Sequence, residues 1–406
     1  MVPRDARSTR NAPQTHATRG PKTNCQMLVQ RVSWRLIARV KSKWTVGTCR
    51  RQGSAGTRDN QRRTLQPMPV ENAPDIPVLL LYNIDPSWTV REREGAHRDT
   101  RRLGLAMRRQ GHSVRFLPVS DSDFSKALSR YDPPEVLVFN WCEGVPGIER
   151  SESMVAETLE KLGFTYTGAT ADALALSYEK SQVKQVLQSH GVPTPRWQVV
   201  TSPRENGWNC FPAIVKPARE HCSRGVDSGA VVTGAASLSK RVAHVLDVFQ
   251  QPALIEDFID GREFHVPLWG NNPVEMLPPA EMDFSAFDDI HNRLCGYDAK
   301  FEPASEAYRK IKSYLPARLT GRELAELEAT SRAAYEAIGC RDYGRIDIRL
   351  RDGVFYVLDV NPNADISADA SLAMAASKAG YCYGVMGSRI LGLAAQRHAQ
   401  NVAPHQ

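Results

Sequence analysis

A stretch near the C-terminal end of the chain, GRIDIRLRDGVFYVLDVNPN at 344–363, constrains the fold most. Two apolar-rich runs flank the triplet Arg351, Asp352 and Gly353, and this pattern predicts a β-hairpin with a three-residue turn. In that register Ile346 opposes Leu358, Ile348 opposes Tyr356 and Leu350 opposes Val354, which gives one apolar face. The other face would carry Arg345, Asp347, Arg349, Phe355, Val357, Asp359 and Asn361.

The polar face of this hairpin needs a physical explanation, because buried polar groups cost free energy unless something satisfies them. Asp347 is expected to lie diagonally from Asp359, ~7–8 Å away between backbones, so both carboxylates could reach one ion. With the amide oxygen of Asn361 they form a hard ligand set suited to Mg²⁺. The alternative is an Arg–Asp network on an exposed sheet face, and the hairpin alone does not decide between the two.

A second polar segment lies around Lys216, which ends the run AIVK. Ser223, Gly225, Ser228 and Gly229 follow, and small side chains with free backbone N–H groups beside an ammonium suit a lid over phosphates. A plain hairpin is the alternative. The sequence contains neither GxxxxGK[ST] nor GxGxxG, so no P-loop or dinucleotide fingerprint is available.

The rest of the chain alternates strand and helix patterns. Apolar runs at IPVLLLYNID, SVRFLPV and PPEVLVFNWCEG are separated by helical patterns, with Ser151 as an expected helix cap, which predicts a parallel sheet wound with helices. We expect four segments: a basic disordered extension (1–74), a parallel α/β domain (75–167), a small α+β lobe with the lid (168–270) and a C-terminal lobe with the metal site (271–398).

Charge and cysteine usage limit the functional classes. Residues 1–70 hold 15 Lys and Arg against two acids, whereas the other 336 residues hold 37 basic and 43 acidic residues, so the net charge of +7 does not indicate a nucleic-acid-binding domain. A start at Met68 is the favoured explanation of the basic segment; a transit peptide or a nucleic-acid arm are alternatives. The sequence contains no apolar run of about 18 residues, so it predicts no membrane-spanning helix. The eight scattered cysteines indicate reduced thiols and a cytoplasmic protein.

Six short motifs occur in an order that identifies a family resemblance. They are SYEK, VKPARE, LIEDFIDGREF, YDAKF, GCRDYGRIDIRL and VLDVNPN. From about Ile76 to Gln396 the chain resembles the ATP-grasp enzymes, specifically the D-alanine–D-alanine ligase family. The resemblance implies an ATP-grasp fold: a parallel α/β N-terminal domain plus two α+β lobes that clasp ATP.

The resemblance also implies an ATP-dependent carbon–nitrogen ligase that joins a small-molecule carboxylate to an amine through an acylphosphate, with Mg²⁺ or Mn²⁺ as the metal. It implies roles for the matching residues of this chain. Lys300 would bind the γ-phosphate, and Arg345 would stabilise charge at the reacting carboxyl. The metal ligands would be Asp347, Asp359 and Asn361. The nucleotide-binding residues would be Lys180, Lys216, Ser223, Glu256, Phe258, Ile259 and Glu263. A homodimer is compatible with the family; a membrane or nucleic-acid partner is not expected.

Several positions depart from the family pattern. The glycine-rich first loop with its glutamate is absent, and Glu92 or Glu94 would substitute only loosely. Cys222 stands at the expected lid serine and Phe301 at the expected tyrosine. Asp359 replaces a glutamate.

The acceptor loop, PNADISADASL, differs most, because Asp365 and Asp369 would repel a carboxylate. We therefore expect an acceptor that is cationic or lacks a carboxylate at that point.

Three other functions remain open: a true D-alanine–D-alanine ligase with an unusual acceptor loop, a D-lactate-using relative suggested by Phe301, and an ATP-binding protein without turnover.

Some polar residues are expected to have ordinary roles. His221 and Cys222 are assigned to the lid surface. His265 and His291 lack zinc-like spacing. Trp141, Cys142 and Glu143 end a strand where α/β sheets place ligands, and of these Glu143 is the better substrate-binding candidate.

Overall fold

The computed structural model describes residues 76–204, 207–221, 223–302 and 304–402. The expectations for the basic extension (1–74), the start at Met68 and the lid residue Cys222 lie outside these residues. In the described part, no helix is long and apolar enough to cross a membrane. The described cysteines, Cys142, Cys210, Cys295, Cys340 and Cys382, form no disulfide bonds.

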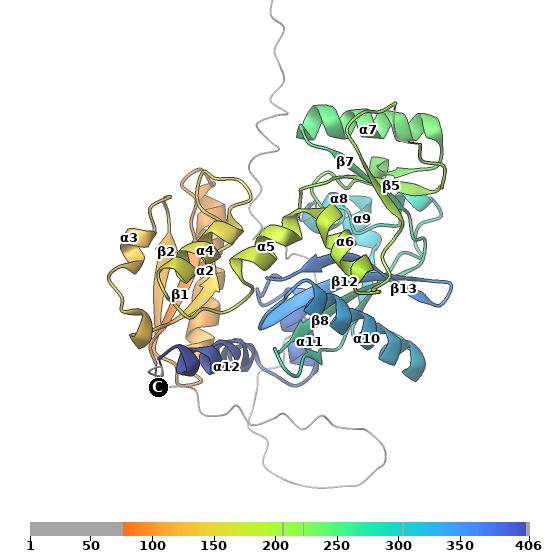
Figure 1. The fold of residues 1–406 in the computed structure, drawn as a ribbon. Helices are drawn as coiled ribbons and strands as arrows, with labels where there is room; N and C mark the ends of the chain where they lie inside the picture. Colours follow the sequence, from red (N-terminus) through yellow and green to blue (C-terminus); the bar gives the residue numbers. More distant parts are fainter. Residues whose placement is uncertain (1–75, 205–206, 222, 303, 403–406) are drawn as a thin grey trace, which may run out of the picture. The chain divides into compact units, whose positions relative to one another are not determined.

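The first sheet is parallel, as the alternating pattern predicts. Its strand order is β2-β1-β3, with β1 at Val78–Asn83, β2 at Val114–Val119 and β3 at Leu137–Trp141. Helices α2 (Val90–Arg108), α3 (Ser125–Leu128) and α4 (Glu152–Lys161) belong to this part of the chain (Figure 1). Ser151 does precede α4, but its hydroxyl does not cap the helix: it accepts from Val145 N at 2.7 Å and donates to Ile148 O at 2.6 Å.

The second sheet is antiparallel and has the order β4-β7-β5-β6. Its strands are β4 (Trp197–Val200), β5 (Ala213–Pro217), β6 (Val231–Val232) and β7 (Ala253–Asp257). Helix α7 (Ala235–Phe249) packs on it through Leu238, Val242 and Val245, which share a core with Val215 and Ile255. This lobe carries Lys216 and Glu256 at the ends of two paired strands.

The third sheet has the order β11-β10-β8-β12-β13, and β9 (Glu275–Met276) pairs with β8. Its other strands are β8 (Arg262–Trp269), β10 (Ala280–Asp283), β11 (Lys312–Tyr314), β12 (Tyr343–Arg351) and β13 (Val354–Asn361). Helices α6 (Lys180–Ser189) and α10 (Gly321–Ala337) contribute Val183, Leu187, Leu327 and Tyr335 to the core beneath one face. The opposite face carries the polar side chains of the hairpin.

Two helical regions of the chain are each interrupted. The segment before Gly191 forms α5 (Ala171–Tyr178) and α6, because Glu179 leaves helical geometry at φ −92° and ψ 79°. The last helical segment forms α11 (Ser371–Lys378) and α12 (Tyr383–Val402), separated at Gly380 with φ +95°. The first break places Lys180 at the start of α6, where its backbone N–H donates to Ala218 O at 3.2 Å.

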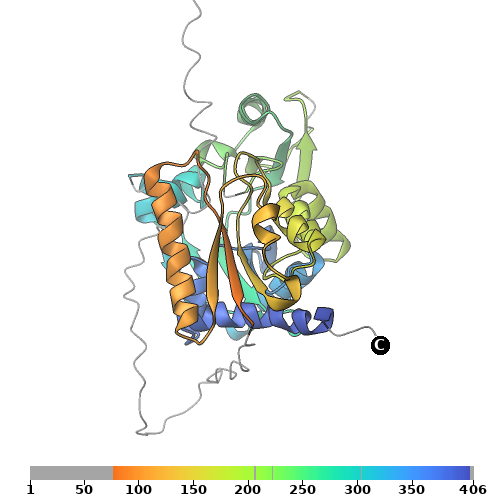
Figure 2. The same cartoon turned by 90° about the vertical axis from the view of Figure 1, so that its left-hand side faces the viewer.

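Helix α12 returns to the parallel sheet. Figure 2 shows α12 alongside the strands of that sheet. Met386 and Ile390 share a core with Leu80 and Phe139, and Ser388 bonds His112 at 2.7 Å. The C-terminal end of the chain therefore stabilises the N-terminal sheet. The two short helices α8 (Tyr297–Phe301) and α9 (Glu306–Lys310) precede β11.

Candidate active site

The hairpin exists, but its predicted register is wrong. Asp347 lies directly opposite Asp359, and Arg345 lies opposite Asn361. The turn contains two residues, Asp352 and Gly353, and a β-bulge follows Asp347, where the partner strand carries one extra residue. An extra residue shifts the inward and outward alternation of that strand.

The bulge moves apolar side chains to the core face. Phe355, Val357 and Val360 are all buried in the core, although the sequence analysis placed Phe355 and Val357 on the polar face. Leu358 and Asp359 both line the pocket instead. The bulge thus places Phe355 and Val357 on the core face and leaves Asp347 and Asp359 directly opposite each other on the polar face.

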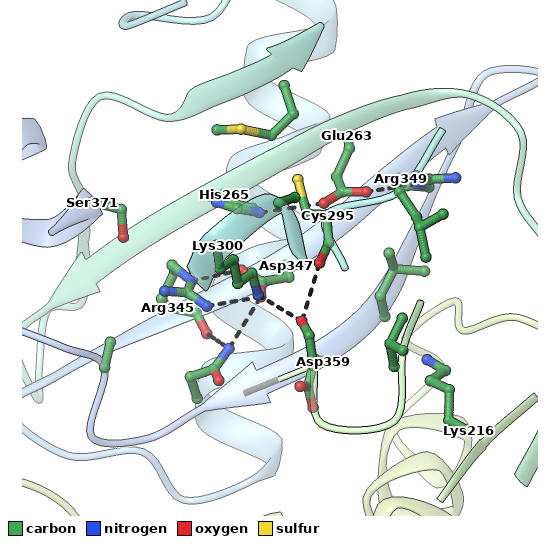
Figure 3. A pocket seen from close by; sticks show the side chains of 18 of the residues that line it. Lys216, Glu263, His265, Cys295, Lys300, Arg345, Asp347, Arg349, Asp359 and Ser371 are labelled. Atoms are coloured by element: carbon green, nitrogen blue, oxygen red, sulfur yellow. Dashed lines mark hydrogen bonds and ion pairs between the residues drawn. The ribbon is translucent and has the colours of Figure 1, made fainter. Parts of the chain in front are cut away.

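The two aspartates and Asn361 form one cluster (Figure 3). Arg345 donates to both oxygens of Asp347, at 2.7 and 2.9 Å, and the amide of Asn361 donates to Asp347 at 3.3 Å. Lys180 lies 3.4 Å from Asp359. Burial alone would raise the pKa of each carboxyl, but Arg345 holds the pKa of Asp347 below its usual range, and Lys180 does the same for Asp359. Both acids are therefore ionised, as a hard cation site requires.

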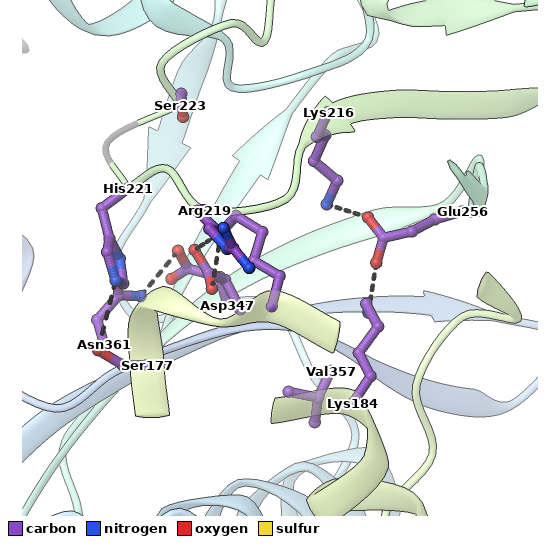
Figure 4. A network of polar contacts seen from close by, with 12 residues as sticks. Ser177, Lys184, Lys216, Arg219, His221, Ser223, Glu256, Asp347, Val357 and Asn361 are labelled. Carbon is purple, nitrogen blue, oxygen red and sulfur yellow. Dashed lines mark hydrogen bonds and ion pairs between the residues drawn. The ribbon is translucent and has the colours of Figure 1, made fainter. Parts of the chain in front are cut away.

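A buried ion-paired triad links the second sheet to α6 (Figure 4). Glu256 forms ion pairs with Lys216 and with Lys184, and it is 1% exposed. Burial would raise the pKa of Glu256, but the two lysines hold it below its usual range. Lys184 was missed by the sequence analysis. Its position one turn after Lys180 on α6 was the available signal, because residues four apart share a helix face.

The expected hinge segment lines the same pocket. Phe258 and Ile259 follow β7 directly, and both face the cavity with Glu256 and Glu263. Glu263 accepts from Arg349 at 2.8 Å, and Arg349 also donates to Ile259 O at 2.8 Å. Arg349 therefore fixes the positions of two groups that the family resemblance assigns to the nucleotide.

The lid residue Ser223 has a left-handed backbone (φ +57°), and its hydroxyl connects two segments. It accepts from Lys300 Nζ at 2.8 Å and donates to Cys295 O at 3.1 Å. His221 is not on the lid surface as expected: it is 6% exposed, bonds Ser177 at 3.3 Å, and its pKa is lowered to about 4, mainly by burial.

The opposite end of the pocket is acidic. Glu143, Glu152, Asp365 and Asp369 line it, and Asn363 donates to Glu152 at 3.0 Å. Burial raises the pKa of Glu152 to about 8, the hydrogen bond from Asn363 opposes this shift, and Glu143 adds to it. Ser371, at the first turn of α11, also lines this end, and its hydroxyl is a buried group with no hydrogen-bond partner in the structure.

The structure also shows where the other residues considered for substrate binding lie relative to the cavity. Glu92 forms a capping box with Thr89 at the start of α2, and neither it nor Glu94 lines the pocket. Trp141 is 4% exposed in the core of the parallel sheet, whereas Glu143 faces the cavity.

All twelve predicted site residues line one cavity of about 270 Å³. They are Lys180, Lys216, Ser223, Glu256, Phe258, Ile259, Glu263, Lys300, Arg345, Asp347, Asp359 and Asn361. The cavity is cationic around the hairpin and acidic near α11. A set of hard oxygens flanked by lysines and an arginine can hold Mg²⁺ together with phosphates.

Comparisons with known proteins agree with this geometry. A D-alanine–D-alanine ligase structure from Bacillus anthracis, complexed with ATP, superposes with a TM-score of 0.61 at 18% identity, covering 80% of this chain and 99% of that one. This likeness confirms the predicted ATP-grasp fold, with its parallel sheet and two antiparallel sheets.

Sequence comparison defines the family. Residues 186–391 match the model for the C-terminus of D-ala D-ala ligases. The D-alanine–D-alanine ligase of Chromohalobacter salexigens is 31% identical over 60% of this chain and 74% of that protein. An uncharacterized protein, y4sG, of Sinorhizobium fredii is 32% identical over 73% of this chain and 87% of that protein. The chain belongs to the D-alanine–D-alanine ligase family, and this confirms its predicted class, the ATP-dependent carbon–nitrogen ligases.

Proposed function

We propose that this protein joins a small-molecule carboxylate to an amine at the expense of ATP, through an acylphosphate, with a divergent acceptor site. The observation that carries the proposal is the convergence of Asp347, Asp359 and Asn361 with Arg345 and Lys180 on one wall of a single cavity. An anionic phosphate must approach an anionic carboxylate in this reaction, so charge neutralisation and positioning are the main physical demands.

The side chains supply this neutralisation from several directions. Lys216 reaches the cavity from β5, Lys180 from the start of α6, and Lys300 from α8 beside the lid. Arg345 would stabilise the negative charge that develops where the reacting carboxyl meets the phosphate, and it would exchange its contact with Asp347 for that charge. When bound, Mg²⁺ would be held by Asp347, Asp359 and Asn361 and would screen the phosphate oxygens.

The remaining nucleotide contacts follow from the same cavity. Glu256, Phe258 and Ile259 would lie along the adenine, Glu263 would accept from the ribose hydroxyls, and Ser223 would close over the phosphates. Since Arg349 already orients Glu263, the carboxylate is held in place before the sugar arrives.

The acidic end of the cavity supports a cationic or carboxylate-free acceptor. Asp365 and Asp369 line the cavity, and Glu143 lies at the same end. Glu152 also lines it, but it is mostly protonated at neutral pH because its pKa is raised to about 8. A carboxylate placed among these groups would be repelled, whereas an ammonium would be attracted.

One observation favours a genuine D-alanine–D-alanine ligase as the second candidate. The buried hydroxyl of Ser371 could donate to an acceptor carboxylate. It lies in the same cavity as Asp369, so the two residues favour opposite acceptors.

A coupled ADP-release screen with the full chain tests the proposal. Single amino acids, diamines and carboxylate–amine pairs are supplied with ATP and Mg²⁺, and product is identified by mass spectrometry. We expect ADP release that depends on both a carboxylate and a cationic amine. Release with D-alanine alone would favour the second candidate. ATP binding by calorimetry without ADP release under any condition would identify an ATP-binding protein without turnover. A homodimer and a cytoplasmic location stay predictions.

A further inference from the structure

Three side chains of different chemistry meet in the wall of the cavity. Glu263 and His265 lie two residues apart on β8 and so project from the same face. Cys295 approaches them from the segment before α8. One ligand atom from each, a carboxylate oxygen, an imidazole nitrogen and a sulfur, lie within 4.8 Å of one another (Figure 3). The sequence shows no zinc-like spacing around His265, because Cys295 lies thirty positions further along the chain.

The carboxylate of Glu263 is already oriented toward this group. Its Oε2 accepts from Arg349 Nε at 2.8 Å, whereas its Oε1 lies 3.3 Å from His265 Nε2. Arg349 is itself 2% exposed and is held by Ile259 O. In metal sites, a carboxylate ligand is commonly oriented by a hydrogen bond to its other oxygen, as Arg349 does here for Glu263. The group is enclosed, since the side chains of Glu263 and His265 are 7% and 12% exposed.

We propose that Glu263, His265 and Cys295 form a binding site for a thiophilic divalent cation such as Zn²⁺. Sulfur, nitrogen and oxygen ligands are the set that Zn²⁺ takes in tetrahedral sites, with water as the fourth ligand. The thiolate and imidazole select against Mg²⁺, which prefers an all-oxygen shell. Binding forms the metal–sulfur bond, and the thiol proton is released to solvent.

A cation at this site would affect nucleotide binding. This part of the inference rests on the proposed function, because it uses the proposed role of Glu263. If Glu263 accepts from the ribose hydroxyls, a cation on Glu263 and the sugar exclude one another. Zn²⁺ would then act as an inhibitor that competes with the nucleotide. Its ligands differ from the oxygen ligands Asp347 and Asp359 but lie next to them, because His265 is directly opposite Asp347 on the neighbouring strand. Mg²⁺ would support the reaction at one site, and a softer metal would block it at the other.

Cobalt substitution tests the site without any substrate. Co²⁺ is titrated into the full chain, and absorption is recorded in the near ultraviolet, where thiolate-to-cobalt charge transfer appears, and in the visible, where tetrahedral Co²⁺ absorbs. We expect both signals to saturate at one ion per chain and Zn²⁺ to displace them. In Cys295→Ser the charge-transfer band should be lost, and in His265→Asn the visible bands should be lost or strongly weakened.

Two control variants separate this site from other thiols. Cys382→Ser removes a cysteine that does not line the cavity, and Cys222→Ser removes the lid cysteine. Both should keep the charge-transfer band. Circular dichroism without metal confirms that each variant is folded. A band that survives in folded Cys295→Ser, or no saturable Co²⁺ signal in the parent chain, would overturn the proposal.

Adenosine tests the overlap with the nucleotide, because it has no phosphates that would sequester the metal. We expect adenosine to weaken the apparent affinity for Co²⁺ in proportion to its own occupancy. Calorimetry that detects adenosine binding with unchanged Co²⁺ affinity would refute the overlap. Co²⁺ binding in a protein that binds neither adenosine nor ATP would refute the proposed function and leave the metal site standing.

Discussion

The two ends of the cavity stabilise their charged groups in different ways. Around the hairpin and the second sheet, acids meet cations: Asp347 with Arg345, Asp359 with Lys180, and Glu256 with Lys216. Near α11, Glu152 accepts from the amide of Asn363, and Asp365 accepts from the hydroxyl of Ser367. We infer that the first end would exchange partners with a polyanion and its metal without gaining net charge, and we propose that the second end attracts a cation.

This contrast separates the proposed binding of the nucleotide from the proposed selection of the acceptor. In the proposed function, the triphosphate is positioned by paired charges on β5, β7, β12 and β13 and on the first residue of α6. The acceptor is proposed to be chosen by charge of one sign, mainly on the loop between β13 and α11. Four substitutions test the two ends separately.

The largest effect is expected at the buried triad. Glu256→Gln keeps the shape of the side chain but leaves Lys184, 2% exposed, without its charged partner. Breaking a buried pair by removing one charge typically costs about 3–5 kcal/mol. Urea denaturation should show this loss in the free energy of unfolding.

The matched control is an exposed pair in the parallel domain. Glu157→Gln breaks the pair with Lys161 on α4, whose side chains are 51% and 69% exposed, and should cost at most about 1 kcal/mol. Equal effects of the two variants would mean that the triad contributes no more than a surface pair.

The second effect concerns catalysis at the hairpin. Asp347→Asn removes one proposed metal ligand and the partner of Arg345, and the rate of ADP release should fall about 10²–10³-fold. Asp352→Asn, in the turn of the same hairpin with a side chain 93% exposed, should leave the rate unchanged. Full activity of Asp347→Asn at saturating Mg²⁺ would remove the proposed metal site from the mechanism.

The third effect is a pH dependence at the acidic end. Because the pKa of Glu152 is raised to about 8, the folded chain keeps a proton that the unfolded chain loses above its ordinary value of 4.5. Stability is therefore lost as the pH rises from about 5 to 8. Glu152→Gln cannot titrate and should lack this loss. If half of the pKa shift is realised, the variant should gain roughly 2 kcal/mol of unfolding free energy over the parent chain at pH 9 relative to pH 5.

Urea denaturation at both pH values measures the effect. The exposed Glu149→Gln, in the segment before α4, should show the same pH profile as the parent chain. If Glu152→Gln changes the free energy of unfolding by the same amount at pH 5 and at pH 9, Glu152 does not titrate between these pH values.

The order of these elements could be predicted from sequence, whereas the details of the site could not. Strand patterns located β1, β2, β3, β12 and β13, and the six motifs contain every proposed nucleotide and metal residue except Ser223, which follows VKPARE by three positions. The bulge beside Leu358 could not be predicted, because an extra residue in one strand leaves the apolar alternation of each run readable in two registers.

Contacts between distant segments were missed for a different reason. Lys184 meets Glu256 across 72 positions, and Cys295 meets His265 across thirty. No local period links such residues, since the meeting is set by how sheets and helices pack. The same limit applies to Ser371, which enters the cavity only because the chain after Asn361 turns back into α11.

The smallest effect decides which acceptor the acidic end selects. Asp369→Asn removes one negative charge from the cavity wall, and the KM for a cationic amine should rise about tenfold, equivalent to ~1.4 kcal/mol. Ser371→Ala should leave that KM unchanged, because an ammonium does not need a hydroxyl donor. If D-alanine is the acceptor, the pattern reverses: Asp369→Asn lowers the KM and Ser371→Ala raises it. Steady-state kinetics of the two variants with both amines therefore assigns the acceptor end by the sign of two changes.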